Sequence, residues 1–187
     1  MTEIFAISGG HTLGKTTLCH ELSWELNRRG LGAGYIQEAV RRSQFMFKGD
    51  RGMKMHVETL LLHMLEEITA SEAFDVLVCD RSAIDYLAYA NVRFGRRSGD
   101  TLYDTLFSAV SSYSRSYRLV FILKTVPAGD QYGNFRQGEN TDSLSVSDEC
   151  VALCKEFSVP FEVVGLPPGS ERSQLVLGSI LRHLGHV

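Results

Sequence analysis

The chain has 187 residues, of which 44% are apolar, so it can form one well-buried domain but hardly two. Its 22 acidic residues slightly outnumber its 19 basic ones, which argues against an overall basic field that would attract nucleic acid or membranes. No apolar run approaches the roughly 20 residues of a membrane span, and the first strand-like segment begins at Glu3, too early for a secretory signal peptide. We therefore expect a single cytoplasmic domain over residues 1–187, with no membrane contact.

Apolar strand-like runs alternate with longer helical patterns along the first half of the chain. Segment 3–8 predicts a strand, and 15–29 predicts a helix whose leucines recur along one stripe. A second strand is expected at 32–38, followed by a long helix at 53–71. The continuous apolar run at 74–80 is typical of a central parallel strand that is covered on both faces.

The second half continues this alternation. In order, it is expected to contain helices at 83–93 and 101–116, a strand at 117–125, a polar segment at 127–141, a helix at 143–157, a strand at 160–165 and a helix at 170–184. This alternation predicts an α/β domain with three layers and a five-stranded parallel sheet. The polar segment 127–141, rich in Gly, Asn, Asp and Gln, is the kind of long loop that often forms a short lid over a site.

The turn after the first strand carries the most specific motif. Gly9, Gly14, Lys15 and Thr16 match the P-loop pattern G-x-x-x-x-G-K-[ST], between a strand and a helix as the motif requires. The glycines let successive N–H groups face phosphate oxygens, the lysine reaches the β and γ oxygens, and the threonine hydroxyl ligates Mg²⁺. The residues expected to bind ATP here are Gly9, Gly10, His11, Thr12, Leu13, Gly14, Lys15, Thr16 and Thr17. The alternative is a plain glycine turn between a strand and a helix.

Charged residues follow the second and third strands, at the edge where the carboxyl ends of parallel strands meet. Asp80 is placed to hold Mg²⁺ through water as a Walker B acid, or else it caps a helix. Arg81 could reach a transferring or acceptor phosphate, or form a structural ion pair. Glu38 could take a proton from an acceptor hydroxyl, or be a solvated loop acid. Arg41 follows one turn later and could grip an acceptor anion or face solvent.

Three further features are candidates for the same site. Arg136 is the single cation of the polar segment, so it could close on the transferring phosphate or stay on the surface. Tyr86 and Tyr89 follow Asp85 on the helix after the third strand, where their rings could stack on a base or pack in the core. The arginines of 93–97 could hold an acceptor phosphate or a nucleic-acid strand, or form a solvated loop.

Taken together, these segments resemble a group of small P-loop kinases. The matching segments, in chain order, are ISGGHTLGKTTL, QEAVRRS, FDVLVCDRSAIDYLAYA, LVFILKTVPAGDQYGNFR and FSVPFEVVGLPPGSERSQLVLGSIL. The group includes the ribosylnicotinamide kinase domain of bacterial bifunctional NAD-synthesis proteins and, more distantly, deoxynucleoside and thymidylate kinases. The resemblance implies that Glu38 and Arg41 contact the acceptor, Asp80 holds magnesium, Arg136 acts from the lid, and Gly169 and Ser170 lie near the adenine.

The sequence therefore predicts a kinase that transfers the γ-phosphate of Mg-ATP to a nucleoside or nucleotide. The expected catalytic residues are Lys15, Glu38, Asp80, Arg81 and Arg136. The expected acceptor contacts are Glu38, Arg41, Arg81, Asp85 and Tyr86, and the expected magnesium ligands are Thr16 and Asp80. Two alternatives stay open: a kinase whose acceptor belongs to DNA or RNA, which the net acidity disfavours, and a regulator that senses ATP without turnover. The oligomeric state is also open, with a dimer as one option.

Overall fold

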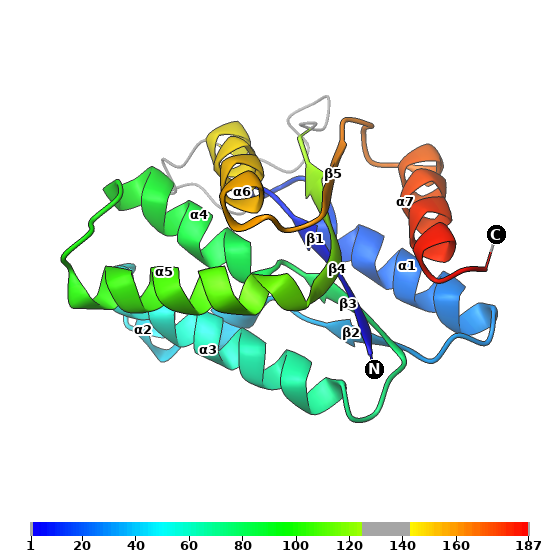
Figure 1. Cartoon of the computed structure of the whole chain (residues 1–187), viewed down its shortest axis with the longest axis horizontal. Helices are drawn as coiled ribbons and strands as arrows, with labels where there is room; N and C mark the ends of the chain where they lie inside the picture. Colours follow the sequence, from blue (N-terminus) through cyan, green and yellow to red (C-terminus); the bar gives the residue numbers. More distant parts are fainter. Residues whose placement is uncertain (1, 125–142, 187) are drawn as a thin grey trace.

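Five strands form one fully parallel sheet in the computed structural model, which describes residues 2–124 and 143–186 (Figure 1). In sheet order they are β2 (Ala33–Ile36), β3 (Val76–Asp80), β1 (Glu3–Ser8), β4 (Tyr117–Leu123) and β5 (Phe161–Val164). The helices are α1 (Lys15–Arg28), η1 (Ala39–Arg42), α2 (Gln44–Phe47), α3 (Met53–Ala70), α4 (Ala83–Phe94), α5 (Thr101–Tyr113), η2 (Ser114–Ser116), α6 (Ser143–Phe157) and α7 (Ser170–His183). Every strand and long helix predicted from the sequence is present, whereas η1 and α2 were not predicted. The expected lid, with Arg136, lies outside the described residues.

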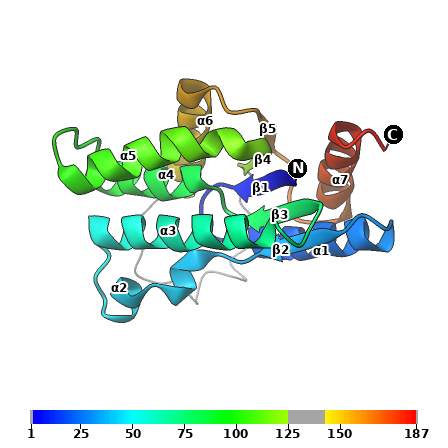
Figure 2. The same ribbon diagram turned by 60° about the horizontal axis from the view of Figure 1, so that its bottom comes forward.

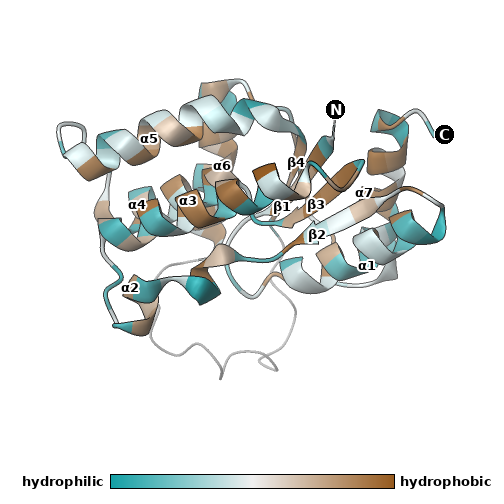
Figure 3. Cartoon of the chain, turned by 90° about the horizontal axis from the view of Figure 1, so that it is seen from below, coloured by the Kyte–Doolittle hydropathy of each residue, from teal (hydrophilic) through white to brown (hydrophobic). Residues whose placement is uncertain are grey.

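Helices cover both faces of the sheet, which makes three layers (Figure 2). Helices α1 and α7 lie on one face, and α3, α4, α5 and α6 lie on the other. Because successive strand residues point to opposite faces, Phe5 and Ile7 join the α1/α7 core cluster, while Ile4 and Ala6 join the cluster on the other face. The strands in the middle of the sheet are coloured hydrophobic in Figure 3, as burial on both sides requires. The predicted three-layer P-loop NTPase fold is therefore confirmed.

Helix α3 buries several polar side chains and exposes several apolar ones. Its buried residues include His63 and Glu67, whereas Leu61, Leu65 and Ile68 are 56%, 62% and 53% exposed. The carboxylate of Glu67 lies 3.0 Å from Nε2 of His63 and accepts a hydrogen bond of 3.2 Å from the Tyr117 hydroxyl. That hydroxyl in turn accepts a hydrogen bond of 2.8 Å from the backbone N–H of Ala83. A buried polar network thus joins α3, β4 and the start of α4.

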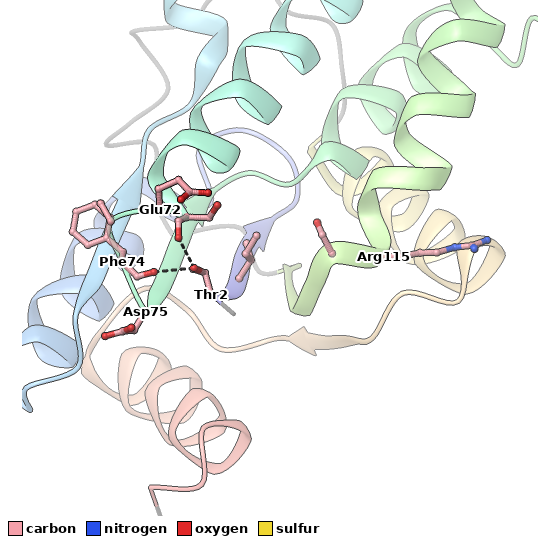
Figure 4. A pocket seen from close by; sticks show the side chains of 9 residues that line it. Thr2, Glu72, Phe74, Asp75 and Arg115 are labelled. Atoms are coloured by element: carbon pink, nitrogen blue, oxygen red, sulfur yellow. Dashed lines mark hydrogen bonds between the residues drawn. The ribbon is translucent and has the colours of Figure 1, made fainter.

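A hollow of about 660 Å³ opens at the edge of the sheet where the strands begin (Figure 4). Beside it, the hydroxyl of Thr2 donates to the carbonyl oxygens of Ser71 and Phe74, at 2.7 and 2.9 Å. Arg115 lies at its far side. The P-loop and the acidic strand tips lie at the other edge, where the strands end. Within residues 2–124 and 143–186, no helix combines the length and the apolar character that crossing a membrane requires.

Candidate functional site

The P-loop curls between β1 and α1 through residues with left-handed backbone. Gly9, Thr12 and Gly14 have φ values of 122°, 63° and 75°. Glycine adopts such angles without strain, which explains the two motif glycines. Gly10 is required for a different reason: a Cβ there would lie 2.2 Å from the carbonyl oxygen of Ser143, at the start of α6. The loop is therefore packed directly against α6.

The first two N–H groups of the loop bond to protein. The N–H of Gly9 donates to Oδ1 of Asp85 at 3.0 Å, and that of Gly10 donates to Oγ of Ser147 at 3.1 Å. The Ser147 hydroxyl donates in turn to the carbonyl of Leu123, at 2.7 Å. These bonds fix the start of the loop to α4, α6 and β4.

Lys15 is buried at the centre of the loop. Its ammonium group donates to the carbonyl oxygen of Gly10 at 2.5 Å. Burial, and next the positive charge of Arg81, lower the pKa of Lys15 to about 8, although Asp85 and Asp80 act in the opposite direction. A buried cation in this position gains stability from an anion placed beside it.

Thr16 and Asp80 bring two oxygen ligands together. The Thr16 hydroxyl donates to Oδ2 of Asp80 at 2.5 Å, across the junction of α1 and β3. Mg²⁺ prefers oxygen ligands and usually takes only one or two from the protein, with water and phosphates completing its shell. The pair therefore fits a magnesium ion. The alternative for Asp80 is excluded, because Ser82 is the N-cap of α4.

A buried ion pair joins the tips of β2 and β3. Nε of Arg81 donates to Oε1 of Glu38 at 2.6 Å, with side chains 7% and 5% exposed. Burial acts to lower the pKa of Arg81, but Glu38, Tyr89 and Asp85 together raise it well above its usual value. Its guanidinium lies 4.6 Å from the ring centroid of Tyr89, and Arg81 itself has φ of 91°. A non-glycine residue in this backbone region is strained, which is typical of functional sites.

The other residues that were expected to contact the acceptor differ in burial and in the partners that they contact. Arg41 is half-exposed, and its Nε lies 3.7 Å from Oε2 of Glu38, so it joins the same cluster.

Asp85 is fully buried and accepts from the N–H and hydroxyl of Ser82, at 2.8 and 3.0 Å, which caps α4. Tyr86 is buried with its ring 5.4 Å from that of His63, and Tyr89 faces Arg81. The structure therefore brings Glu38, Arg41 and Arg81 together, and it places Asp85 in the supporting framework.

Arg172 is a site residue that the sequence did not reveal. From the first turn of α7, Nη1 donates to the carbonyl of Leu13 at 2.8 Å and Nη2 donates to that of Gly14 at 3.3 Å. The residue is 3% exposed, and burial lowers its pKa. Since Gly169 and Ser170 begin the same helix, the segment expected near the adenine lies beside the P-loop. The sequence did contain one signal for Arg172: it is a charged residue on the same helical stripe as the apolar residues Val176 and Ile180.

The parallel three-layer fold, the P-loop after β1 and the acid at the end of β3 define a P-loop nucleotide-binding domain. The family model described as "AAA domain" matches residues 4–172, and the chain belongs to that family. A search of the curated proteins found no match to this sequence.

Solved structures share the fold at low sequence identity. A NadR protein in complex with NAD and AMP-PNP is 13% identical, with a TM-score of 0.72 over 98% of this chain and 50% of that chain. A NadR protein in complex with NR is 16% identical, with a TM-score of 0.71 over 98% and 51%. Deoxyadenosine kinase from M. mycoides with bound dATP is 16% identical, with a TM-score of 0.62 over 95% and 98%. The chain thus spans about half the length of the NadR chains. The resemblance to small P-loop kinases is confirmed for the fold.

Proposed function

We propose that this protein is a kinase that uses Mg-ATP to phosphorylate a nucleoside or nucleotide. One observation carries the proposal: the Glu38–Arg81 pair lies at the same sheet edge as the P-loop and the Thr16–Asp80 pair. A donor site at the P-loop and an acceptor site at Glu38 and Arg81 would therefore share one edge, as two-substrate transfer requires. The structures of similar fold that contain AMP-PNP and dATP support nucleotide binding by this fold.

In the donor half, Lys15 and the N-terminus of α1 would bind the β- and γ-phosphates. Gly9 and Gly10 would shape the loop, because their N–H groups bond to protein, and the contacts to phosphate would come from 11–17. Thr16 and Asp80 would hold Mg²⁺, which neutralises charge on the phosphates when bound. Gly169 and Ser170 would lie beside the base.

In the acceptor half, the hydroxyl oxygen of the acceptor attacks the γ-phosphorus and forms a new P–O bond. The bond from the γ-phosphorus to the oxygen that bridges it to the β-phosphate breaks, and ADP leaves with that electron pair. Glu38 takes the hydroxyl proton, and Arg81 orients its carboxylate. If the acceptor is already a monophosphate, no base is needed, and Arg81 and Arg41 would bind its phosphate. Arg136, proposed from the sequence alone, would add charge stabilisation.

A coupled assay of ADP release across nucleosides and nucleoside monophosphates tests the proposal. Glu38→Gln should lower kcat for a nucleoside by about 10²–10⁴-fold while ATP still binds. Glu72→Gln, at the opposite edge of the sheet, is the matched control and should behave as wild type. Absence of acceptor-dependent turnover across the whole panel would refute the proposal, and ATP binding without turnover would favour the sensor.

A further inference from the structure

Positive charge is concentrated in two short segments of this net acidic chain. Segments 39–57 and 91–97 contain eight Lys or Arg residues and a single acid, which leaves 11 basic and 21 acidic residues elsewhere. The eight are Arg41, Arg42, Lys48, Arg51, Lys54, Arg93, Arg96 and Arg97. These segments carry a net charge of +7, whereas the whole chain has a net charge of −3. The overall acidity therefore conceals a strongly basic region.

The two segments lie together at one end of the molecule. The loop after α4, helix α2 and the start of α3 share the end of the molecule that points away from α7 in Figures 1 and 2. The ring of His56, on α3, lies 5.9 Å from that of Phe94 at the end of α4. Burial, and next the charges of Arg93 and Arg81, lower the pKa of His56 to about 4. Arg41, in the first of the two segments, lies 3.7 Å from Glu38, so the basic region adjoins the proposed acceptor half of the site.

Some of these cations form ion pairs with acidic residues of the protein. Arg96 pairs with Glu156 and Glu149, at 2.9 and 3.4 Å, and Arg42 pairs with Glu66. Among the described residues, Lys48, Lys54, Arg93 and Arg97 are exposed and form no ion pair with another described residue, and Arg41 is exposed beside Glu38; we call these five residues the basic strip. Arg41 contacts Glu38 at 3.7 Å, so the strip begins at the proposed base.

Aromatic rings accompany the strip. Arg93 and Arg97 each hold their guanidinium 5.5 Å from the ring centroid of Phe94. Phe47, the last residue of α2, is 80% exposed. Proteins that bind single-stranded nucleic acid combine a positive surface that follows the phosphates with aromatic rings on which bases stack.

The length of the strip decides between a mononucleotide and a strand. From Asp85, beside Arg81, to Phe94, helix α4 advances nine residues, or about 14 Å at 1.5 Å per residue. One strand of nucleic acid places a phosphate about every 3.4 Å along the axis of a duplex, so this distance corresponds to about four nucleotides. The end of α4, which carries Arg93, therefore lies about 14 Å along the helix axis from the Arg81–Asp85 contact, a length that matches a short strand better than one nucleotide.

We propose that the basic strip binds the backbone of a single-stranded polynucleotide and that the acceptor hydroxyl belongs to that strand. The inference rests on the proposed kinase function and narrows its acceptor. Phosphates of the strand would contact Lys48, Lys54, Arg93 and Arg97. A base would stack on Phe47, and one nucleotide would reach Glu38 and Arg81.

Fluorescence anisotropy with labelled single strands of 2, 6 and 12 nucleotides, as DNA and as RNA, tests the binding. The 6-mer and 12-mer should bind similarly and at least about tenfold more tightly than the dinucleotide, because the strip spans about four nucleotides. With four phosphate contacts, raising salt from 50 to 200 mM should weaken binding about 50-fold. The comparison of DNA with RNA identifies the sugar. A nucleoside monophosphate that competes as well as the 6-mer would overturn the inference.

Matched triple variants locate the surface. Changing Lys48, Lys54 and Arg93 to Gln should weaken binding about 100-fold at 0.1 M salt and reduce the salt slope by about two units. Changing Arg28, Arg115 and Lys155 to Gln removes the same charge from exposed positions outside the strip and should leave binding unchanged. Equal losses in the two variants would overturn the strip.

Transfer from γ-labelled ATP separates this inference from the function it rests on. Oligonucleotides with free terminal hydroxyls or a hydroxyl-bearing base should accept label better than the free nucleosides. If nucleosides accept the label and strands do not, the inference about the strand is overturned and the kinase proposal stands. Strand binding without transfer to any acceptor would refute the kinase and leave the strip as a binding surface.

Discussion

Replacing the P-loop lysine should stabilise the protein without nucleotide, although it should abolish turnover. The pKa of Lys15 falls from 10.5 to about 8 because the ammonium is buried, net of its attraction to nearby carboxylates. At 1.36 kcal/mol per unit, keeping this charge in the folded state costs about 3 kcal/mol. Lys15→Met removes the charge and keeps much of the volume, so at pH 7 its Tm should exceed that of wild type by about 6–12 °C.

The pH dependence has a definite sign. Below pH 8, Lys15 is protonated in both the folded and unfolded states, so the full advantage of the variant is present. Between pH 8 and 10.5, the unfolded state binds the proton more tightly, so wild-type stability rises with pH and the difference disappears. Thermal unfolding at pH 7 and pH 10 measures this, with exposed Lys155→Met as the control. A variant less stable than wild type at pH 7, or a difference independent of pH, would refute the argument.

Four other substitutions test the framework around the site. Gly10→Ala should lower the free energy of unfolding by about 1–3 kcal/mol and weaken ATP binding, because the new Cβ would collide with Ser143. Gly165→Ala is the control and should change neither quantity, because its Cβ would meet no atom within 4 Å. Chemical denaturation and ATP titration measure the two effects. Asp85→Asn should lower the free energy of unfolding by about 3–5 kcal/mol in urea, because it removes a buried charge that three donors share. Arg172→Met should raise the Kd for ATP, measured by calorimetry, because the P-loop loses the hydrogen bonds that Arg172 donates to its carbonyl oxygens. His56→Gln should flatten the loss of stability between pH 6.5 and 4, where unfolded chains take up a proton that folded His56 refuses; an unchanged slope would contradict this.

Much of the fold followed from the sequence because its signals are local. Alternating apolar runs fixed the strands, and the P-loop pattern fixed the first turn, so Glu38 and Asp80 could be assigned to one edge of the sheet. The contacts of Arg172 and Asp85 were not predictable in this way. Arg172 lies 159 residues from Leu13, and Asp85 lies 76 residues from Gly9, so no local pattern records either pair.

The orientation of helix α3 could not be predicted from the sequence for a related reason. Leu61 and Leu65 are exposed whereas Glu67 is buried, and a buried carboxylate requires polar partners. Tyr117, on a distant strand, supplies such a partner to Glu67, and only tertiary structure reveals this. The short elements η1 and α2 carry too few residues for a periodic signal.

The bonds from Arg172 to the P-loop also bear on how the protein is made. A ribosome synthesises the P-loop among the first residues of this sequence and α7 among the last. The P-loop of the emerging chain therefore lacks the hydrogen bonds from Arg172 until α7 has left the exit tunnel. If ATP binds as proposed, its stabilising effect on the chain should begin only when α7 has docked.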